Sequence, residues 1–249
     1  MATTPQHIWI IGASSGIGRE LARQYAGAGH KLALSARRAE KLEDVNRELE
    51  GDHHVIPCDI SDAEGMVQAV QDAQSALGHF DKVILLSAIY KPGKIDALDA
   101  TSVEQMVDVN LKGAFYTVLP LVPILSEQHG RPQLVLCGSV AGYRGLPNAQ
   151  PYAATKAGIN SLAESLKAEY DATIDVRVLN PGFVDTPMTE QNEFPMPMMI
   201  PVEKAAKAII NGLEGHGFEV HFPKRFTLIM KLLRALPDTF YFPIVKRLV

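Results

Sequence analysis

The stretch Gly12-Ala13-Ser14-Ser15-Gly16-Ile17-Gly18 follows a short run of β-forming residues, His7–Gly12, and opens a helical pattern that runs from Gly16 to about Ala28. A dinucleotide pyrophosphate needs backbone amides facing it, no side chains in its way and the positive end of a helix dipole. The glycines are spaced G-x-x-x-G-x-G rather than the more usual G-x-G-x-x-G, and a turn with a structural role alone is the alternative. The strand–loop–helix context favours a phosphate-binding loop.

The rest of the chain alternates apolar runs with amphipathic stretches. Strands are predicted at His7–Gly12, Lys31–Ala36, His54–Cys58, Lys82–Ala88, Gln133–Cys137, Ile174–Leu179 and Glu219–Phe222. Helices are predicted at Gly16–Ala28, Glu40–Leu49, Ala63–Leu77, Val103–Ser126, Tyr152–Glu169 and Val202–Glu214. Pro120 and Pro123 are expected to kink or shorten the fourth of these helices. Strands separated by helices pair in parallel with right-handed crossovers, so we predict an α/β fold: one doubly wound, Rossmann-type domain (1–249) with a mostly parallel sheet of about seven strands and helices on both faces.

The composition is that of an ordinary globular protein. Of the 249 residues 47% are hydrophobic and 21% charged, and the formal net charge is -4, which disfavours a nucleic-acid partner. Two cysteines, Cys58 and Cys137, do not make a disulfide framework, which favours a reducing cytoplasm. The segment Met1–His7 lacks the pattern of a secretory signal, and no uncharged apolar stretch approaches the ~20 residues of a spanning helix. We expect a cytoplasmic protein without a metal site.

Two adjacent arginines, Arg37 and Arg38, follow the second predicted strand, and Arg37 stands nineteen residues after Gly18. Proteins that bind NAD carry an acidic residue roughly 20 residues past the glycines, where it holds the ribose 2′-hydroxyl. The first carboxylate here is Glu40, and a guanidinium fork binds a 2′-phosphate instead. A solvated pair of charges at the start of a helix is the alternative. Together with the glycine loop, the two arginines predict NADP(H) as cofactor.

A candidate proton-transfer pair, Tyr152 and Lys156, opens the fifth predicted helix, where a spacing of four residues places both side chains on one face. A free phenol titrates near pH ~10, too high for exchange at neutral pH. An ammonium ~4 Å away, at an effective dielectric of ~20, contributes ~4 kcal/mol, enough to lower the pKa by up to ~3 units. Ser139, thirteen residues before Tyr152, follows a strand and can hydrogen-bond a substrate carbonyl or simply cap a turn.

With these motifs in this order, the chain resembles the short-chain dehydrogenase/reductase family from about His7 to Gly212. The resemblance implies that Asn110 is a fourth catalytic residue beside Ser139, Tyr152 and Lys156. It also implies a set of cofactor contacts that begins in the glycine loop and includes an adenine contact at Asp59 and a nicotinamide contact at Thr186. That set comprises Gly12, Ser14, Ser15, Gly16, Ile17, Gly18, Arg37, Arg38, Asp59, Ile60, Ala88, Tyr152, Lys156, Pro181, Gly182, Val184 and Thr186.

The family mechanism implies a role for each catalytic residue. Tyr152 acts as general acid in reduction and general base in oxidation, and Lys156 lowers its pKa and holds the nicotinamide ribose. Ser139 polarises the substrate carbonyl, and Asn110 anchors a water that relays protons. We therefore expect NADP(H)-dependent interconversion of a carbonyl and an alcohol. A sensor of the same fold that has lost catalysis is the alternative, although it need not keep all four residues. A serine hydrolase would require a G-x-S-x-G elbow, and Cys137 stands where its first glycine belongs.

The sequence departs from the family pattern at the end of the fourth strand. Asn-Asn-Ala-Gly is usual there, whereas this chain reads Leu86-Ser87-Ala88-Ile89, and Ile11 replaces a common threonine before the first glycine. The departure puts in doubt how this turn is held and how closely it approaches the ribose. No proton-transfer group is lost, so activity is expected to survive.

Two segments outside the motifs carry further expectations. The family places its substrate loop at about 185–201, where five apolar side chains either cover an apolar substrate or pack on the protein or a partner subunit: Met188, Phe194, Met196, Met198 and Met199. The amphipathic, basic extension at about 224–249 could lie on an anionic membrane surface, wrap a second subunit or close over the pocket. A homo-oligomer is expected, as dimer or tetramer.

Overall fold

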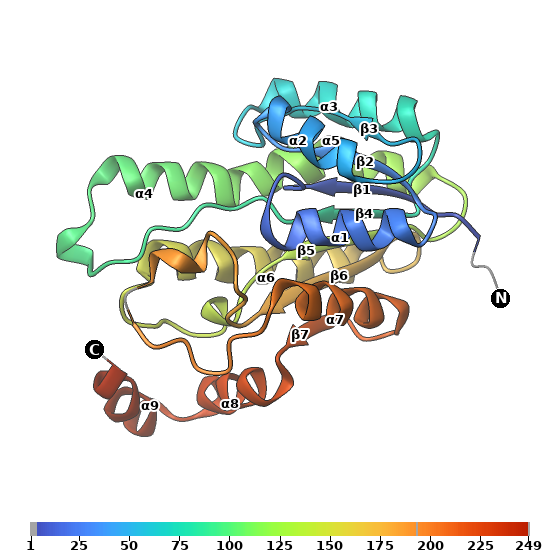
Figure 1. Cartoon of the computed structure of the whole chain (residues 1–249). Helices are drawn as coiled ribbons and strands as arrows, with labels where there is room; N and C mark the ends of the chain where they lie inside the picture. Colours follow the sequence, from blue (N-terminus) through green and yellow to red (C-terminus); the bar gives the residue numbers. More distant parts are fainter. Residues whose placement is uncertain (1–3, 193, 249) are drawn as a thin grey trace.

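The computed structural model describes residues 4–192 and 194–248, and a seven-stranded sheet runs through it (Figure 1). The strands are β1 (His7–Ile11), β2 (Lys31–Ser35), β3 (His54–Val55), β4 (Lys82–Leu85), β5 (Gln133–Cys137), β6 (Asp175–Pro181) and β7 (Glu219–Phe222). Their order is β3-β2-β1-β4-β5-β6-β7, and every neighbouring pair is parallel. The predicted doubly wound, Rossmann-type sheet is confirmed.

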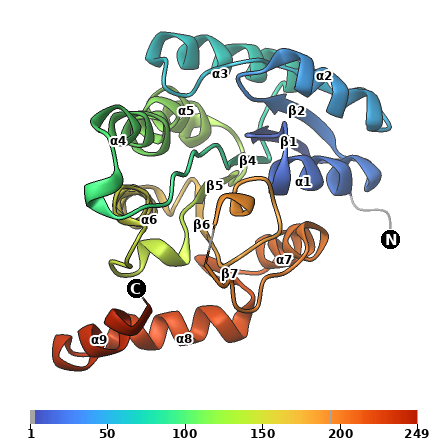
Figure 2. The ribbon, with the colours of Figure 1, turned by 60° about the vertical axis from the view of Figure 1, so that its left-hand side comes forward.

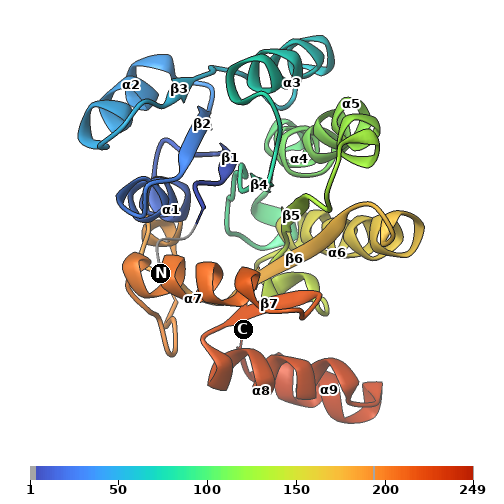
Figure 3. The same cartoon turned by 90° about the vertical axis from the view of Figure 1, so that its right-hand side faces the viewer.

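Helices cover both faces of the sheet (Figures 2 and 3). They are α1 (Gly16–Gly27), α2 (Ala39–Glu48), α3 (Ala63–Leu77), α4 (Ala100–Val107), α5 (Gly113–Glu127), α6 (Gln150–Tyr170), α7 (Val202–Glu214), α8 (Lys224–Ala235) and α9 (Asp238–Val245). Helices α3, α5 and α6 lie on one face, and α1, α2 and α7 lie on the other. The sheet is thus the middle of three layers.

Alternation along the strands divides the core into two clusters. In β1, Trp9 and Ile11 point into the cluster under α3, α5 and α6, whereas Ile8 and Ile10 point into the cluster under α1 and α7. All four side chains are completely buried, because successive residues of a strand face opposite sides of a sheet that is covered on both. Burial on both sides explains why the strands read as continuous apolar runs.

The first two strands each end one residue earlier than the sequence predicts, and the next two each end three residues earlier. The third strand pairs only over His54–Val55, and the fourth stops at Leu85 rather than continuing to Ala88. In both places the chain leaves the sheet to form a loop at its carboxyl edge, at residues 56–60 and 86–89. The apolar run therefore predicts correctly where each of these strands begins, but not the residue at which it ends.

The fourth predicted helix runs further than expected, from Ala100 to Glu127, with one π-helical turn at Asp108–Lys112 between α4 and α5. Of the two effects expected of Pro120 and Pro123, a kink or a shortening, the shortening is wrong, since both residues lie inside α5. Proline has no N–H, so the carbonyl four residues before it lacks its helical donor. For Pro123 this is the carbonyl of Leu119, a well-exposed residue. Packing of the other face of α5 against the core holds the helix together.

By length and composition alone, the helical stretch Ala100–Glu127 could cross a membrane. Half of its most apolar window is buried inside the protein, where α5 packs against α3. Core helices of this kind meet the same criteria, so the stretch is weak support for a spanning segment.

The C-terminal extension forms α8 and α9, which follow each other along one side of the molecule (Figure 2). Helix α8 packs beside β7, and Met230 on α8 joins Val140 and Tyr143, from the segment after β5, in a small apolar cluster. The extension therefore packs on the protein itself, and its last residue, Val249, lies outside the described residues.

Candidate active site

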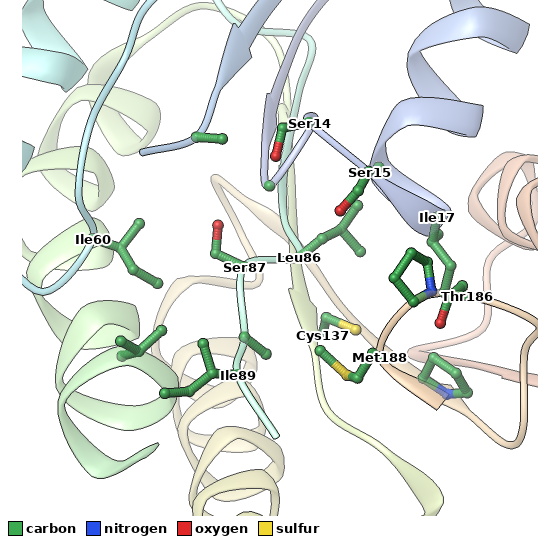
Figure 4. A pocket seen from close by; sticks show the side chains of 18 of the residues that line it. Ser14, Ser15, Ile17, Ile60, Leu86, Ser87, Ile89, Cys137, Thr186 and Met188 are labelled. Atoms are coloured by element: carbon green, nitrogen blue, oxygen red, sulfur yellow. The ribbon is translucent and has the colours of Figure 1, made fainter. Parts of the chain in front are cut away.

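A cleft opens at the carboxyl ends of the strands (Figure 4). It lies by β1 and β4, where the strand order changes direction: β2 and β3 follow on one side of β1, and β4 to β7 follow on the other. This switch point is where ligands bind in doubly wound sheets. All seventeen residues predicted to contact a cofactor line the cleft, and so does Ser139. Asn110 lies in a smaller adjoining cavity, which Lys156 and Ser87 also line. The structure thus brings together the residues that the sequence singled out along nearly the whole chain.

Close packing explains two of the loop glycines. A Cβ at Gly18 would lie 2.1 Å from the carbonyl oxygen of Gly12, so any side chain there would push α1 away from the loop. Gly12 has a φ of +100°, and a Cβ there would lie 2.8 Å from the amide nitrogen of Ser87. Glycine at position 18 therefore lets α1 pack against the loop, and glycine at position 12 lets the loop pack against the turn after β4.

The N-terminus of α1 points into the cleft through Gly16, Ile17 and Gly18. The first amides of a helix have no intrahelical partner, and the side chain of the capping residue Ser15 makes no hydrogen bond to them. These amides and the helix dipole together make an anion-binding position. A dinucleotide pyrophosphate fits this position.

Arg37 and Arg38 lie at the cleft where β2 ends, and both are exposed. Within the described part of the chain, neither guanidinium forms an ion pair. The side chain of Asp59 is held at the same edge, since its Oδ1 accepts hydrogen bonds from Ser61 N (2.9 Å) and Ser61 Oγ (2.7 Å). Two cations thus remain available to a ligand beside a fixed carboxylate.

Ser139, Tyr152 and Lys156 meet on the cleft wall from two elements. Ser139 follows β5 and caps a single turn at Val140–Gly142, its Oγ accepting a hydrogen bond from Ala141 N at 3.1 Å. Tyr152 and Lys156 project from the first turns of α6, and Lys156 Nζ lies 5.6 Å from the centroid of the Tyr152 ring. The turn-capping role considered for Ser139 is thus confirmed, and because Ser139 also lines the cleft, its contact with a substrate carbonyl stays a prediction.

The expectation that Lys156 lowers the pKa of Tyr152 is wrong for this structure. Packing around the phenol raises the pKa of Tyr152, and only a hydrogen bond with Ser139 acts in the other direction. Burial also lowers the pKa of Lys156, whose Nζ donates to the carbonyl oxygen of Cys137 at 2.6 Å. Burial is the largest cause of both shifts, because desolvation disfavours the charged form of each group.

Asn110 holds the turn whose sequence departs from the family pattern. Its Oδ1 accepts from Ile89 N and its Nδ2 donates to Ile89 O, both at 2.8 Å. The same Nδ2 lies 3.3 Å from Thr155 Oγ1 on α6. Asn110 is 3% exposed and sits in the π-helical turn between α4 and α5. This one side chain fixes the turn to the helix that carries Tyr152.

Tyr90 belongs to the site, although nothing in the sequence singled it out. Its ring meets the ring of Tyr152 edge-on, with centroids 4.9 Å apart, and its hydroxyl donates to Asn192 Oδ1 at 2.9 Å. Asn192 lies in the predicted substrate loop and in turn donates to Met196 Sδ. Tyr90 thus joins that loop to the phenol of the candidate proton donor. The only feature of the sequence that could have indicated Tyr90 as a site residue is its place just past the end of the fourth strand.

The substrate loop is bound at both ends. Val184 pairs with Ile200 in a parallel bridge, and a short helical turn, Thr189–Gln191, lies between them. Of the five apolar side chains expected to cover a substrate, Met188 lines the cleft, whereas three are exposed: Phe194, Met198 and Met199. Residue 193 of this loop lies outside the described residues.

Several further residues of the cleft wall were not singled out as contacts. They are Ala36, Cys58, Leu86, Ser87, Ile89, Val109, Cys137, Gly138, Pro187, Met188 and Thr189. Nearly all of them are immediate neighbours of predicted residues at strand ends, so extending each motif by one or two positions would have found them. Over the described residues, no three histidine, cysteine or acidic side chains are grouped to hold a metal ion.

Comparison with known proteins agrees with this geometry. The family model described as short chain dehydrogenase matches residues 6–195, so the chain belongs to that family of oxidoreductases. An uncharacterized oxidoreductase of Mycobacterium tuberculosis is 34% identical over 218 residues, which cover 85% of each chain. A match of this extent supports the oxidoreductase class on the sequence level.

Solved structures share the fold. An alcohol dehydrogenase of Thermococcus sibiricus complexed with 5-hydroxy-NADP superposes with a TM-score of 0.79 at 23% identity, covering 88% of this chain and 96% of its own. A short chain dehydrogenase/reductase of Burkholderia phymatum in complex with NAD gives a TM-score of 0.83 at 19% identity, covering 93% of this chain and 94% of its own. Structures of this fold therefore hold nicotinamide cofactors with and without a 2′-phosphate.

Proposed function

We propose that this protein is an NADP(H)-dependent oxidoreductase that interconverts a ketone or aldehyde and the corresponding alcohol. The observation that carries the proposal is the meeting, in one cleft, of the glycine loop, the two exposed arginines Arg37 and Arg38, and the group Ser139, Tyr152 and Lys156. The cofactor would supply or accept the hydride. We propose further that the whole chain, 1–249, works as a single domain.

The cleft is suited to a phosphorylated dinucleotide. The glycine loop leaves no room for side chains between α1 and the turn after β4, and the amides at the start of α1 would bind the pyrophosphate. Arg37 and Arg38 would bind the 2′-phosphate, and Asp59 would lie beside the adenine. Thr186 and Gly182, which also line the cleft, would contact the nicotinamide.

The four candidate catalytic residues have separate tasks. Ser139 Oγ accepts a hydrogen bond from the amide of Ala141 and shares one with the phenol of Tyr152, and its proton would turn to a substrate carbonyl when one is bound. Tyr152 would give its phenolic proton to the developing alkoxide during reduction and take it back during oxidation. Lys156 would hold the cofactor ribose. Both amide hydrogens of the Asn110 side chain are in use, so a relayed water would donate to an Asn110 oxygen.

The electrostatics favour the reductive role of Tyr152 in the free protein. Because packing raises the pKa of the phenol, Tyr152 holds its proton at neutral pH and is ready to donate it. Oxidation of an alcohol would require the phenolate, and thus added positive charge near the ring. We expect the reverse reaction to become efficient only at alkaline pH.

An apolar carbonyl compound suits the substrate side of the cleft. Ile89 and Met188 line it, and the Tyr90 ring faces Tyr152. Apolar side chains of this kind bind longer alkyl chains more tightly, because a longer chain buries more apolar area. A series of aldehydes of increasing length tests this proposal, since a flat series of kcat/KM values contradicts it.

The decisive experiment follows NADPH absorbance with a panel of carbonyl compounds. The wild-type protein should oxidise NADPH, and Tyr152→Phe should lose at least about a hundredfold in kcat while binding NADPH normally, because general acid catalysis contributes roughly 100- to 10,000-fold. Tyr170→Phe, at the other end of α6, is the matched control. Normal NADPH binding without turnover of any carbonyl compound would favour the alternative, a sensor of the same fold.

Cofactor choice is tested with Arg37→Ala/Arg38→Ala. Each charge-assisted hydrogen bond contributes about 1.5–3 kcal/mol, so KM for NADPH should rise at least tenfold while KM for NADH changes little. Lys41→Ala, which removes a neighbouring exposed cation on α2, is the control. Equal kcat/KM values for NADPH and NADH in the wild-type protein would refute the NADP(H) preference.

We also propose a homo-oligomer in a reducing, cytoplasmic compartment. Phe115 and Leu119 on α5 are exposed apolar side chains suited to a subunit contact. Cys58 and Cys137 are both free thiols, as a reducing compartment would keep them. Light scattering gives the subunit number, and a monomer at micromolar concentration would contradict the oligomer.

A further inference from the structure

The C-terminal extension presents large apolar side chains to solvent. Six of them have exposed fractions of 42–66%: Leu228, Ile229, Leu232, Phe240, Phe242 and Ile244. Leu228 and Leu232 are one helical turn apart and lie on the same face of α8, next to Ile229. Six exposed side chains of this size within one extension are far more than scattered surface hydrophobics.

This exposed surface cannot be turned inward, because the opposite sides of both helices are already packed. Thr227 and Met230 are buried beneath α8, and Tyr241 and Val245 beneath α9. The guanidinium of Arg144 lies 3.7 Å from the Tyr241 ring centroid.

Arg144 also binds the backbone where α8 ends. Its Nη1 donates to the carbonyl oxygen of Leu236 at 2.6 Å, and its Nη2 forms an ion pair with the Asp238 carboxylate. The Tyr241 hydroxyl donates to Gly145 O at 2.5 Å. Because residues 144–145 belong to the segment that follows Ser139, the extension is tied to the catalytic side of the sheet, and its outward surface has a fixed direction.

The same extension concentrates positive charge. It holds six basic residues, Lys224, Arg225, Lys231, Arg234, Lys246 and Arg247, against the single acidic residue Asp238. The other 18 basic and 27 acidic residues give the rest of the chain a net charge of -9. Five of the six cations are exposed, whereas Lys231 pairs with Glu219 and Asp238 pairs with Arg144. Exposed apolar side chains are therefore flanked by five exposed cations, none of which forms an ion pair with a described residue.

We propose that α8 and α9 dock this protein on an anionic lipid surface, with the apolar side chains entering the headgroup boundary and the cations meeting lipid phosphates. Interfacial helices bind through this combination of buried apolar area and attraction to anionic lipids. A second copy is a poorer occupant, since a two-fold interface would set one strongly cationic surface against another. An acidic soluble protein could bind the cations, but its binding would not account for the six exposed apolar side chains.

Docking would also place the substrate loop near the lipid. The Phe183 ring lies 5.3 Å from that of Phe226 at the start of α8, and 6.1 Å from that of Phe194 in the loop, measured between centroids. A lipid-soluble carbonyl compound could therefore pass from the bilayer toward the cleft. This consequence rests on the proposed function, whereas the docking itself does not.

Vesicle flotation tests the proposal with the full-length protein. The wild type should float with vesicles of equal parts phosphatidylcholine and phosphatidylglycerol, less so at high salt, and not with phosphatidylcholine alone. Leu228→Glu/Leu232→Glu should weaken binding at least about tenfold, because it replaces two inserting side chains by anions. Lys224→Glu/Arg225→Glu should remove the preference for anionic vesicles.

Matched variants separate docking from general effects of charge and from folding. Lys204→Glu/Lys207→Glu makes the same charge reversal on exposed positions of α7, and Val67→Glu replaces an exposed apolar residue on α3; both should float like the wild type. Circular dichroism and NADPH binding in solution should be unchanged in every variant. Absence of wild-type binding to anionic vesicles, equal flotation of the α8 variants, or a lower oligomer mass of Leu228→Glu/Leu232→Glu in solution would overturn the proposal.

Discussion

Lys82 offers a quantitative test of the electrostatics of the core. It begins β4 and is 5% exposed, with its Nζ 5.6 Å from the centroid of the Tyr25 ring. Burial lowers the pKa of Lys82 from 10.5 to about 8, against the attraction of Glu214 and Asp175, which act to raise it. An ammonium in this position costs free energy that an apolar side chain of similar length would not. The perturbation is therefore Lys82→Met.

The size and sign of the effect follow from that pKa. A shift of about 2.5 units at about 1.4 kcal/mol each is a cost of about 3 kcal/mol, with the two carboxylates already included. Below pH 8 the lysine is protonated in both the folded and the unfolded state, so the whole cost is present. Between pH 8 and 10.5 the unfolded state binds more protons, so the free energy of unfolding rises with pH. Above pH 10.5 the cost is gone.

Urea denaturation followed by circular dichroism measures this directly. Lys82→Met should be more stable than the wild type by up to about 3 kcal/mol at pH 7, and the difference should shrink as the pH approaches 10.5. Lys41→Met, at an exposed position of α2, should show no such pH-dependent difference. A Lys82→Met protein no more stable than the wild type at pH 7, or a difference that stays constant with pH, would refute the reasoning.

Three further substitutions test the site. Gly18→Ala should abolish NADPH binding in fluorescence titration, because its Cβ would lie 2.1 Å from Gly12 O; unchanged affinity would contradict the packing argument. Asn110→Ala leaves the Ile89 amide and carbonyl without partners, so it should lower the free energy of unfolding by about 2–4 kcal/mol and reduce kcat, and wild-type values of both would exclude this role. Tyr90→Phe removes only the hydrogen bond to the substrate loop and should raise KM for the carbonyl compound severalfold at constant kcat; an unchanged KM would separate the loop from binding.

The positions of the predicted contacts could be read from the sequence because they depend on local features. Gly12, Arg37, Asp59 and Ser139 each follow a strand, and parallel strands bring their carboxyl ends to one edge of the sheet whatever the details of packing. The apolar run that marks a strand is continuous in sequence. The apolar runs indicate the edge at which Gly12, Arg37 and Ser139 lie, whereas the contact at Asp59 was implied by the family resemblance.

Other properties of the same residues could not be read in this way. The spacing of Tyr152 and Lys156 correctly predicts that they share one helix face, yet the direction in which the Tyr152 pKa moves depends on the atoms packed around it. Spacing likewise could not show that Asn110 holds the turn at Ile89, since the two residues are brought together only by the packing of α4 and α5.

The sequence by itself determined the order of strands and helices, the chemistry at the carboxyl edge and the amphipathic character of the extension, because each is a property of neighbouring residues. Only the tertiary structure decided which side of α8 and α9 faces outward, how the turn after β4 is held and how far burial opposes charge on Tyr152, Lys156 and Lys82. These quantities depend on distances between distant segments and on the exclusion of water, and both come into being only when the chain has folded.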